Sequence, residues 1–344
     1  MMKKILVAIT LLISSIHVSA QTRVVILSDF PPVDVVPGGM GFGDADKRSD
    51  SDDMQSMVRF LLYTNEFDVE GLVATSATFA NRANKQNIYD ILYLYDAVDE
   101  HLRKHDERYP TAKQLKKVTW QGRSGTWGKK AEEIVGDGKA SEASKQIAQL
   151  LKKRDKRPVW FCVWGGSVDL AQALWQLENQ LSTKRFQEVL AKVRVYLIGL
   201  QDGSGQWMLD KYPDLFAIVS QHNYMGMFNN AHGADQSLAD LNWINRHIRK
   251  GHGLLGAVYP ESGFYPEHPG VWEGDSPSFL YLVSDALGIS DAEKPWQDSW
   301  GGRFFQPDKA KNHWFDAPGG GMHVYKWRKA VQDDFAKRAD WMLP

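Results

Sequence analysis

The chain has 344 residues, of which 41 are Lys or Arg and 42 are Asp or Glu, so its formal net charge is −1. This near balance argues against a nucleic-acid-binding surface and against a polybasic membrane-binding surface, and it fits a small neutral ligand. Cys162 is the single cysteine, which excludes an intrachain disulfide. It lies in the apolar run 159–164, which is typical of a buried structural thiol rather than of a nucleophile.

The N-terminal residues have the features of a secretory signal peptide. Lys3 and Lys4 precede an apolar run over 5–13, and Ser19 and Ala20 form a small-residue cleavage signal. The apolar run is about half the roughly 20 residues that a membrane span needs. We therefore expect cleavage after Ala20, a periplasmic or secreted mature protein, and no stable membrane anchor.

The mature chain alternates short β-branched runs with longer amphipathic runs. Strands are predicted over 23–28, 69–75, 158–163 and 193–198, and helices over 54–63, 87–102, 141–151 and 170–177. This alternation predicts an α/β fold with an open, mostly parallel sheet flanked by helices. No linker marks a boundary, so a single domain over 21–344 is expected. Beyond Gln201, Gly, Asn, Trp and Pro make regular elements hard to assign.

Acidic residues occur at three places where chemistry is expected. Asp29 directly follows the first strand, at the edge of a parallel sheet where ligands bind. Asp52 and Asp53 open the helix that follows, and Asp275 precedes another apolar helix start. Turn formation or helix capping explains each acid taken alone. Clustered carboxylates, however, favour an oxygen-binding hard cation that neutralises their charge.

Together these positions resemble the nucleoside hydrolase superfamily, whose signature is a first strand, an Asp-rich loop ending in two aspartates, and a helix. The chain matches further through 69–75, 165–171 and 274–277. The runs 52–63, 273–280 and 300–304 are more closely similar to the secreted nucleoside hydrolase-like family, some members of which are labelled cellulose-binding. The resemblance implies a nucleoside hydrolase-like fold with a bound Ca²⁺.

The resemblance also implies residue roles. Asp29 would be a metal ligand and the general base toward water, while Asp53, Asp275 and the Val168 carbonyl would be further calcium ligands. Asp52 would bind sugar hydroxyls. Weaker candidates for contacts to the sugar are Asn81, Gln201, Asp202 and Asn223.

Two features depart from the superfamily pattern. The loop between Asp29 and Asp52 is expanded, and Gly274 stands where true nucleoside hydrolases commonly have a histidine near the leaving base. Candidates for a replacement general acid are Glu261, Glu273, His222 and His268. Each of these four also has an ordinary interpretation as a loop residue. Metal binding can therefore be retained here without recognition of a nucleobase.

The leading hypothesis is a secreted, calcium-dependent hydrolase of a glycosidic bond, either N-ribosyl or O-glycosidic, in which Asp29 and calcium activate water. The alternative is a carbohydrate-binding protein that keeps the fold and metal without turnover. A sugar or nucleoside is the expected partner. The sequence leaves the leaving group, the sugar and the oligomeric state open, and a homo-oligomer is compatible with it.

Overall fold

The computed structural model describes residues 21–37, 48–49, 51–76, 81–263 and 267–344. The predicted signal peptide and half of the expanded loop after Asp29, including Asp50, lie outside the described residues. No helix in the described ranges is long and apolar enough to cross a bilayer.

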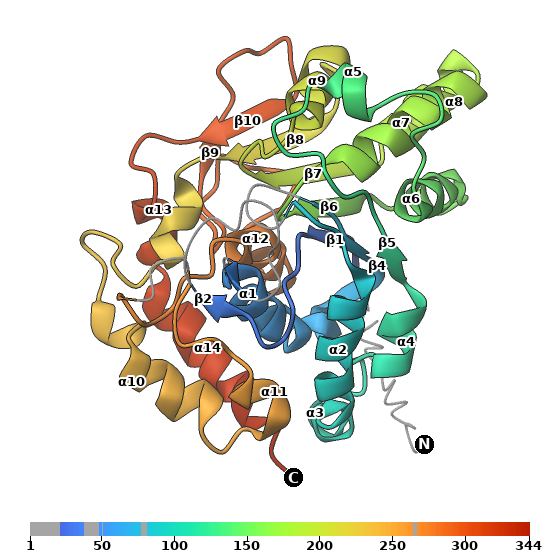
Figure 1. Cartoon of the computed structure of the whole chain (residues 1–344). Helices are drawn as coiled ribbons and strands as arrows, with labels where there is room; N and C mark the ends of the chain where they lie inside the picture. The colour runs from blue at the N-terminus through green and yellow to red at the C-terminus, as the bar shows by residue number, and fades with distance from the viewer. Residues whose placement is uncertain (1–20, 38–47, 50, 77–80, 264–266) are drawn as a thin grey trace, which may run out of the picture.

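The centre of the molecule is one sheet with the strand order β5-β4-β1-β6-β7-β8-β10-β9 (Figure 1). In that order the strands span Thr119–Gln121, Phe67–Ala74, Thr22–Ser28, Val159–Val163, Val193–Ile198, Phe216–Ser220, His313–Asp316 and Phe304–Phe305. Every pairing is parallel except the one between β10 and β9. This confirms the predicted fold class and all four predicted strands. A separate short pair joins β2 (Val36–Pro37) and β3 (Arg48–Ser49).

Helices cover both faces of the sheet. The α-helices α1 to α7 span Asp52–Leu61, Lys85–Asp96, Asp99–His105, Ala112–Lys117, Ala131–Ile134, Glu142–Lys152 and Val168–Gln180. Helices α8 to α14 span Thr183–Leu190, Gly203–Lys211, Leu241–Ile244, Gly253–Ala257, Ser276–Ala286, Met322–Tyr325 and Arg328–Asp340. Short 3₁₀ turns lie at Thr64–Glu66, Asn223–Met227 and Gln236–Leu238, and a π turn lies at Asn245–Arg249.

The pleat of β1 divides the core between the two faces. Val24 and Ile26 belong to an apolar cluster with α1, α2, α12 and α14, whereas Val25 and Leu27 belong to one with α6, α7, α8 and α9. Successive strand residues point to opposite faces, so a strand buried on both sides is apolar throughout. Cys162 is fully buried in the first cluster, and burial raises the pKa of its thiol to about 12, which is unsuited to a nucleophile.

One predicted helix differs in the structure. The run 87–102 forms two helices, α2 and α3, because the backbone of Val98 leaves the helical region with φ −126° and ψ −11°. The apolar side chains Ile88, Ile91, Leu92, Tyr95 and Val98 are nonetheless all buried as the periodicity predicts.

Candidate functional site

Three carboxylates from two distant parts of the sequence meet beyond the carboxyl ends of the central strands. Asp52 and Asp53 form the first turn of α1, and Asp275 is the residue before α12. One carboxylate oxygen from each lies within 4.8 Å of the others, which is a spacing that a single cation can bridge. Asp53 and Asp275 are buried and Asp52 is half-buried. We call these residues the acidic cluster.

The cluster is electrostatically costly in the absence of a positive charge. Burial raises the pKa of Asp53 to about 6, although a hydrogen bond donated by the Ser28 hydroxyl at 2.5 Å favours its ionised form. The Asp53 amide donates to the Asp52 carboxylate at 2.8 Å. An oxygen-only donor set of this kind suits a hard divalent cation such as Ca²⁺. The three residues therefore fit the metal that the sequence predicts.

Asp29 lies next to the cluster without belonging to the group of three. It is buried and follows Ser28, the last residue of β1, whose hydroxyl contacts Asp53. The loop after β6 lies beside the end of β1, because the Trp164 amide donates to the Leu27 carbonyl at 2.7 Å. The structure therefore places Asp29 at the predicted edge, and its role as a base stays a prediction.

Val168 is the first residue of α7, and its side chain is fully buried in the second apolar cluster. In a helix, a carbonyl at this position points along the axis toward the amide four residues on. This orientation competes with a role as metal ligand. The assignment of the Val168 carbonyl stays a prediction that metal binding has to test.

The segment that carries Asp275 is held against α1 by buried polar contacts that the sequence does not predict. Arg59 forms an ion pair with Glu273, and both side chains have no exposed surface. Gln55 accepts a hydrogen bond from the Trp272 amide at 2.6 Å and donates to the Gly270 carbonyl at 3.0 Å. Gln55 and Arg59 occupy successive turns of α1, so one face of this helix holds the segment 270–273 in place.

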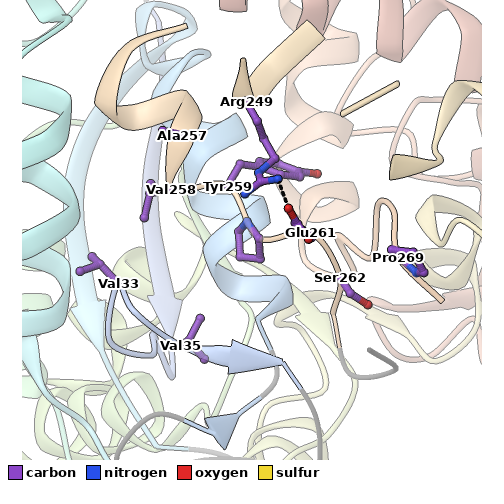
Figure 2. Close-up of a pocket in the computed structure, with 10 residues that line it drawn as sticks. Val33, Val35, Arg249, Ala257, Val258, Tyr259, Glu261, Ser262 and Pro269 are labelled. Carbon is purple, nitrogen blue, oxygen red and sulfur yellow. Dashed lines mark hydrogen bonds and ion pairs between the residues drawn. The ribbon is translucent and has the colours of Figure 1, made fainter. Parts of the chain in front are cut away.

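The four candidate general acids are not equally available. Glu273 is fully buried and accepts hydrogen bonds from Arg59, Tyr259 and Ser276, which argues against proton donation to a ligand. Glu261 is paired with Arg249 at the wall of a separate hollow of about 510 Å³, between the chain after β1 and the segment before α12 (Figure 2). His222 and His268 are exposed.

Gly274 explains the absence of a histidine at this position. A Cβ atom there would lie 2.8 Å from an Asp52 carboxylate oxygen and 3.5 Å from ring atoms of both Tyr224 and Phe228. The glycine thus allows Asp52 to approach the chain closely. The two rings, which are half-buried with centroids 5.8 Å apart, form an aromatic wall near Asp52.

The weaker candidates for sugar contacts are largely occupied by the protein itself. Asn81 accepts a hydrogen bond from the Trp127 amide at 3.1 Å, and its backbone has φ +47°. Gln201 donates to the Trp164 carbonyl, and Asp202 caps α9 by accepting from the Ser204 amide at 2.9 Å. Asn223 is fully buried and donates to the Arg303 carbonyl at 2.9 Å. These contacts lie within the protein, and the predicted sugar-binding roles remain predictions.

Comparison with known proteins agrees with this architecture. Residues 42–304 match the family described as cellulose-binding Sde182, nucleoside hydrolase-like domain. The chain belongs to this family. That membership confirms the resemblance inferred from the Asp-rich motifs.

Two solved structures are similar to this nucleoside hydrolase-like chain. A nucleoside hydrolase-related hypothetical protein from Saccharophagus degradans, associated with carbohydrate metabolism, is 28% identical with a TM-score of 0.74, over 94% of this chain and 72% of that one. A plant nucleoside hydrolase is 12% identical with a TM-score of 0.46, over 93% of this chain and 99% of that one. No match was found among curated proteins.

Proposed function

We propose that this chain is a secreted, calcium-dependent hydrolase that cleaves a glycosidic bond in an N-ribosyl or related sugar substrate. The observation that carries the proposal is the convergence of Asp52, Asp53 and Asp275, two of them buried. Three carboxylates at this spacing favour a divalent cation over three separate charges. Membership of a nucleoside hydrolase-like family supports a sugar as the ligand.

In this proposal Asp53 and Asp275 hold the cation, and Asp29 with the Val168 carbonyl completes its ligand set. When bound, calcium would lower the pKa of a coordinated water and help to orient sugar hydroxyls. Asp29 accepts a proton from the attacking water, whose oxygen bonds to the anomeric carbon as the bond to the leaving group breaks. Asp52 accepts hydrogen bonds from the sugar hydroxyls, and the aromatic wall of Tyr224 and Phe228 excludes water from one side.

A second candidate function is carbohydrate binding without turnover. It is favoured by Gly274, which leaves no room for the superfamily's histidine, and by the buried pairing of Glu273, which removes a nearby candidate acid. A leaving group that needs a proton would then have to take it from a group other than Glu273. Binding alone, conversely, has no need of the base Asp29.

The deciding experiment is a screen of the purified mature protein with excess calcium against nucleosides and plant or algal oligosaccharides. The enzyme proposal predicts release of a reducing sugar that chelation abolishes and that Asp53→Asn reduces strongly. An exposed-surface variant, Lys329→Ala, serves as the matched control and should retain full turnover. Saturable binding without any product would instead support the non-catalytic function.

A further inference from the structure

Strands β9 and β10 pair at one edge of the sheet (Figure 1). A second hollow lies at this edge. It has a volume of about 850 Å³. Its lining consists of Trp296, Arg303, Phe304, Phe305, Gln306, Lys309, Trp314, Ala317, Pro318 and His323. We call this surface the edge groove. None of the acidic-cluster residues lines it, so it is a separate feature of the molecule.

Two large aromatic side chains in the edge groove face solvent. Trp296 is 49% exposed and Phe305 is 44% exposed. The Trp296 ring packs against Trp314 with centroids 5.5 Å apart, and the Trp314 indole is itself held by a hydrogen bond to Asn312 at 3.1 Å. Exposed aromatic rings on a firm support are typical of binding surfaces. The C–H faces of sugar rings pack well on such rings.

The charge of the groove is positive. Its lining contains Arg303 and Lys309 and no Asp or Glu. Neither cation forms an ion pair within the described part of the chain, and Lys309 donates only to the Gln306 amide oxygen at 3.2 Å. The nearby carboxylate of Asp298 forms an ion pair with Lys326 at 2.6 Å, and its pKa is lowered by this lysine first and, to a smaller extent, by the charge of Arg303.

The carboxylates of two other acids near the groove accept hydrogen bonds from backbone amides. Asp308 accepts a hydrogen bond from the Ala310 amide at 3.0 Å, and Asp316 accepts from the Gln221 and His222 amides at 2.6 Å each. No carboxylate lines the groove, and none forms an ion pair with either of its two cations in the described part of the chain. A ligand with negative groups would supply a counter-charge.

His323 adds a hydrogen-bonding atom that no described residue uses. Its side chain is 7% exposed, and its Nε2 contacts the Pro318 carbonyl at 2.9 Å. Nε2 therefore carries the proton of the neutral ring, which makes Nδ1 an acceptor. Nδ1 is buried and has no hydrogen-bond partner in the described residues, and its nearest charged neighbour is Asp298 at 3.9 Å. A hydroxyl group of a ligand would satisfy it.

We propose that the edge groove binds an acidic oligosaccharide. Its sugar rings stack on Trp296 and Phe305, its carboxylates face Arg303 and Lys309, and one hydroxyl donates to His323 Nδ1. The site goes beyond the proposed hydrolysis and stands independently of it. The two sites are nevertheless connected, because the Arg303 carbonyl accepts from Asn223, the neighbour of Tyr224 in the aromatic wall.

The test is calorimetric titration of the full mature chain with an oligogalacturonate and with a cello-oligosaccharide of equal length as the neutral counterpart. A chelator is present throughout, so that calcium-mediated binding at the acidic cluster does not contribute. The proposal predicts saturable binding of the acidic ligand, weaker binding of the neutral one, and weakening by salt. The absence of binding by the wild-type protein, or a preference for the neutral ligand, would overturn it.

Variants locate the binding. Trp296→Ala and Phe305→Ala should each weaken binding about tenfold, and the double variant Arg303→Gln, Lys309→Gln should remove the preference for the acidic ligand. Tyr93→Ala, at a 68% exposed ring on α2, is the matched control and should bind like wild type. Asp275→Asn should also bind like wild type. If Asp275→Asn abolishes binding and Trp296→Ala does not, the ligand lies at the acidic cluster and the proposal is wrong.

Discussion

Arg59 and Glu273 form a fully buried ion pair that fastens α1 to the segment preceding α12. Arg59 Nη2 donates to Glu273 Oε1 at 2.9 Å, and the hydroxyls of Tyr259 and Ser276 donate to the same carboxylate at 2.6 Å each. Because Asp53 lies on α1 and Asp275 follows Glu273 by two residues, this pair helps to fix the separation of two carboxylates in the acidic cluster.

Removing the charge of Glu273 should destabilise the protein strongly. Glu273→Gln leaves the Arg59 guanidinium buried without a counter-ion, and breaking such a pair typically costs about 3–5 kcal/mol. Chemical denaturation in the presence of a chelator measures the free energy of unfolding. Lys329→Ala removes an exposed ion pair with Asp333 and should change that free energy by less than about 0.5 kcal/mol. Equal effects of the two substitutions would contradict the proposed importance of the buried pair.

The metal-free protein should lose stability as the pH rises toward neutrality. Burial raises the pKa of both Asp53 and Asp169 from 3.8 to about 6. The folded state therefore binds more protons than the unfolded chain between pH about 4 and about 6, so the free energy of unfolding falls through this window. Each group should contribute on the order of 1–3 kcal/mol. Denaturation at several pH values in chelator measures this change.

Calcium should distinguish the two carboxyls. A cation at the acidic cluster favours ionised Asp53, so excess calcium should remove the Asp53 part of the pH dependence and raise the melting temperature above pH about 6. Asp169 is outside the acidic cluster and hydrogen-bonds to Ser141 at 2.5 Å, so its part should persist with calcium. Asp53→Asn and Asp169→Asn form the matched pair of variants. Identical melting curves in calcium and in chelator would contradict metal binding.

Adding a single methyl group at Gly274 should impair the site while leaving the fold intact. The new Cβ atom would approach an Asp52 carboxylate oxygen to 2.8 Å, so that carboxylate has to move. We expect Gly274→Ala to weaken sugar binding about tenfold with a small loss of stability, on the order of 1 kcal/mol. Gly288→Ala is a control for the general effect of replacing a glycine, since no atom lies within 4 Å of a Cβ there, although its φ of +69° adds backbone strain. Wild-type sugar affinity in Gly274→Ala would show that Asp52 does not need its observed position.

The sequence predicted the sheet, and it placed Asp53 and Asp275 at one metal site, because both features leave local signals. It named Asp29 as the third carboxylate ligand, whereas the carboxylate that lies with Asp53 and Asp275 is that of Asp52. β-branched runs identify buried strands, and Asp residues at helix starts are visible as motifs. The partners that hold the cluster together leave no such signal. In the sequence Glu273 looks like an ordinary loop acid. Only the fold shows that it packs against Arg59 of α1. Likewise, the sequence did not predict α14, because charged residues dominate Arg328–Asp340. The apolar residues of its buried face are only Val331, Phe335 and Ala339, and the other buried residues of this helix are polar or charged.

The roles of Asp29 and Asp52 can be separated by substitution. Asp29→Asn should keep the fold and remove most turnover, because an amide cannot accept a proton from water, and loss of a general base typically costs about 10² to 10⁴ in rate. Asp52→Ala should weaken sugar binding instead, since it removes contacts made before and during the reaction.

Rates, sugar affinity and calcium content are measured for both variants, because Asp29 is also a predicted metal ligand. Equal calcium content in Asp29→Asn and wild type assigns the lost rate to proton transfer. A different result would contradict the enzyme proposal: wild type binds a sugar, hydrolyses no substrate, and Asp29→Asn binds that sugar equally well. The protein would then be a carbohydrate-binding member of its family, because Asp29 would have no reaction in which to act as a base.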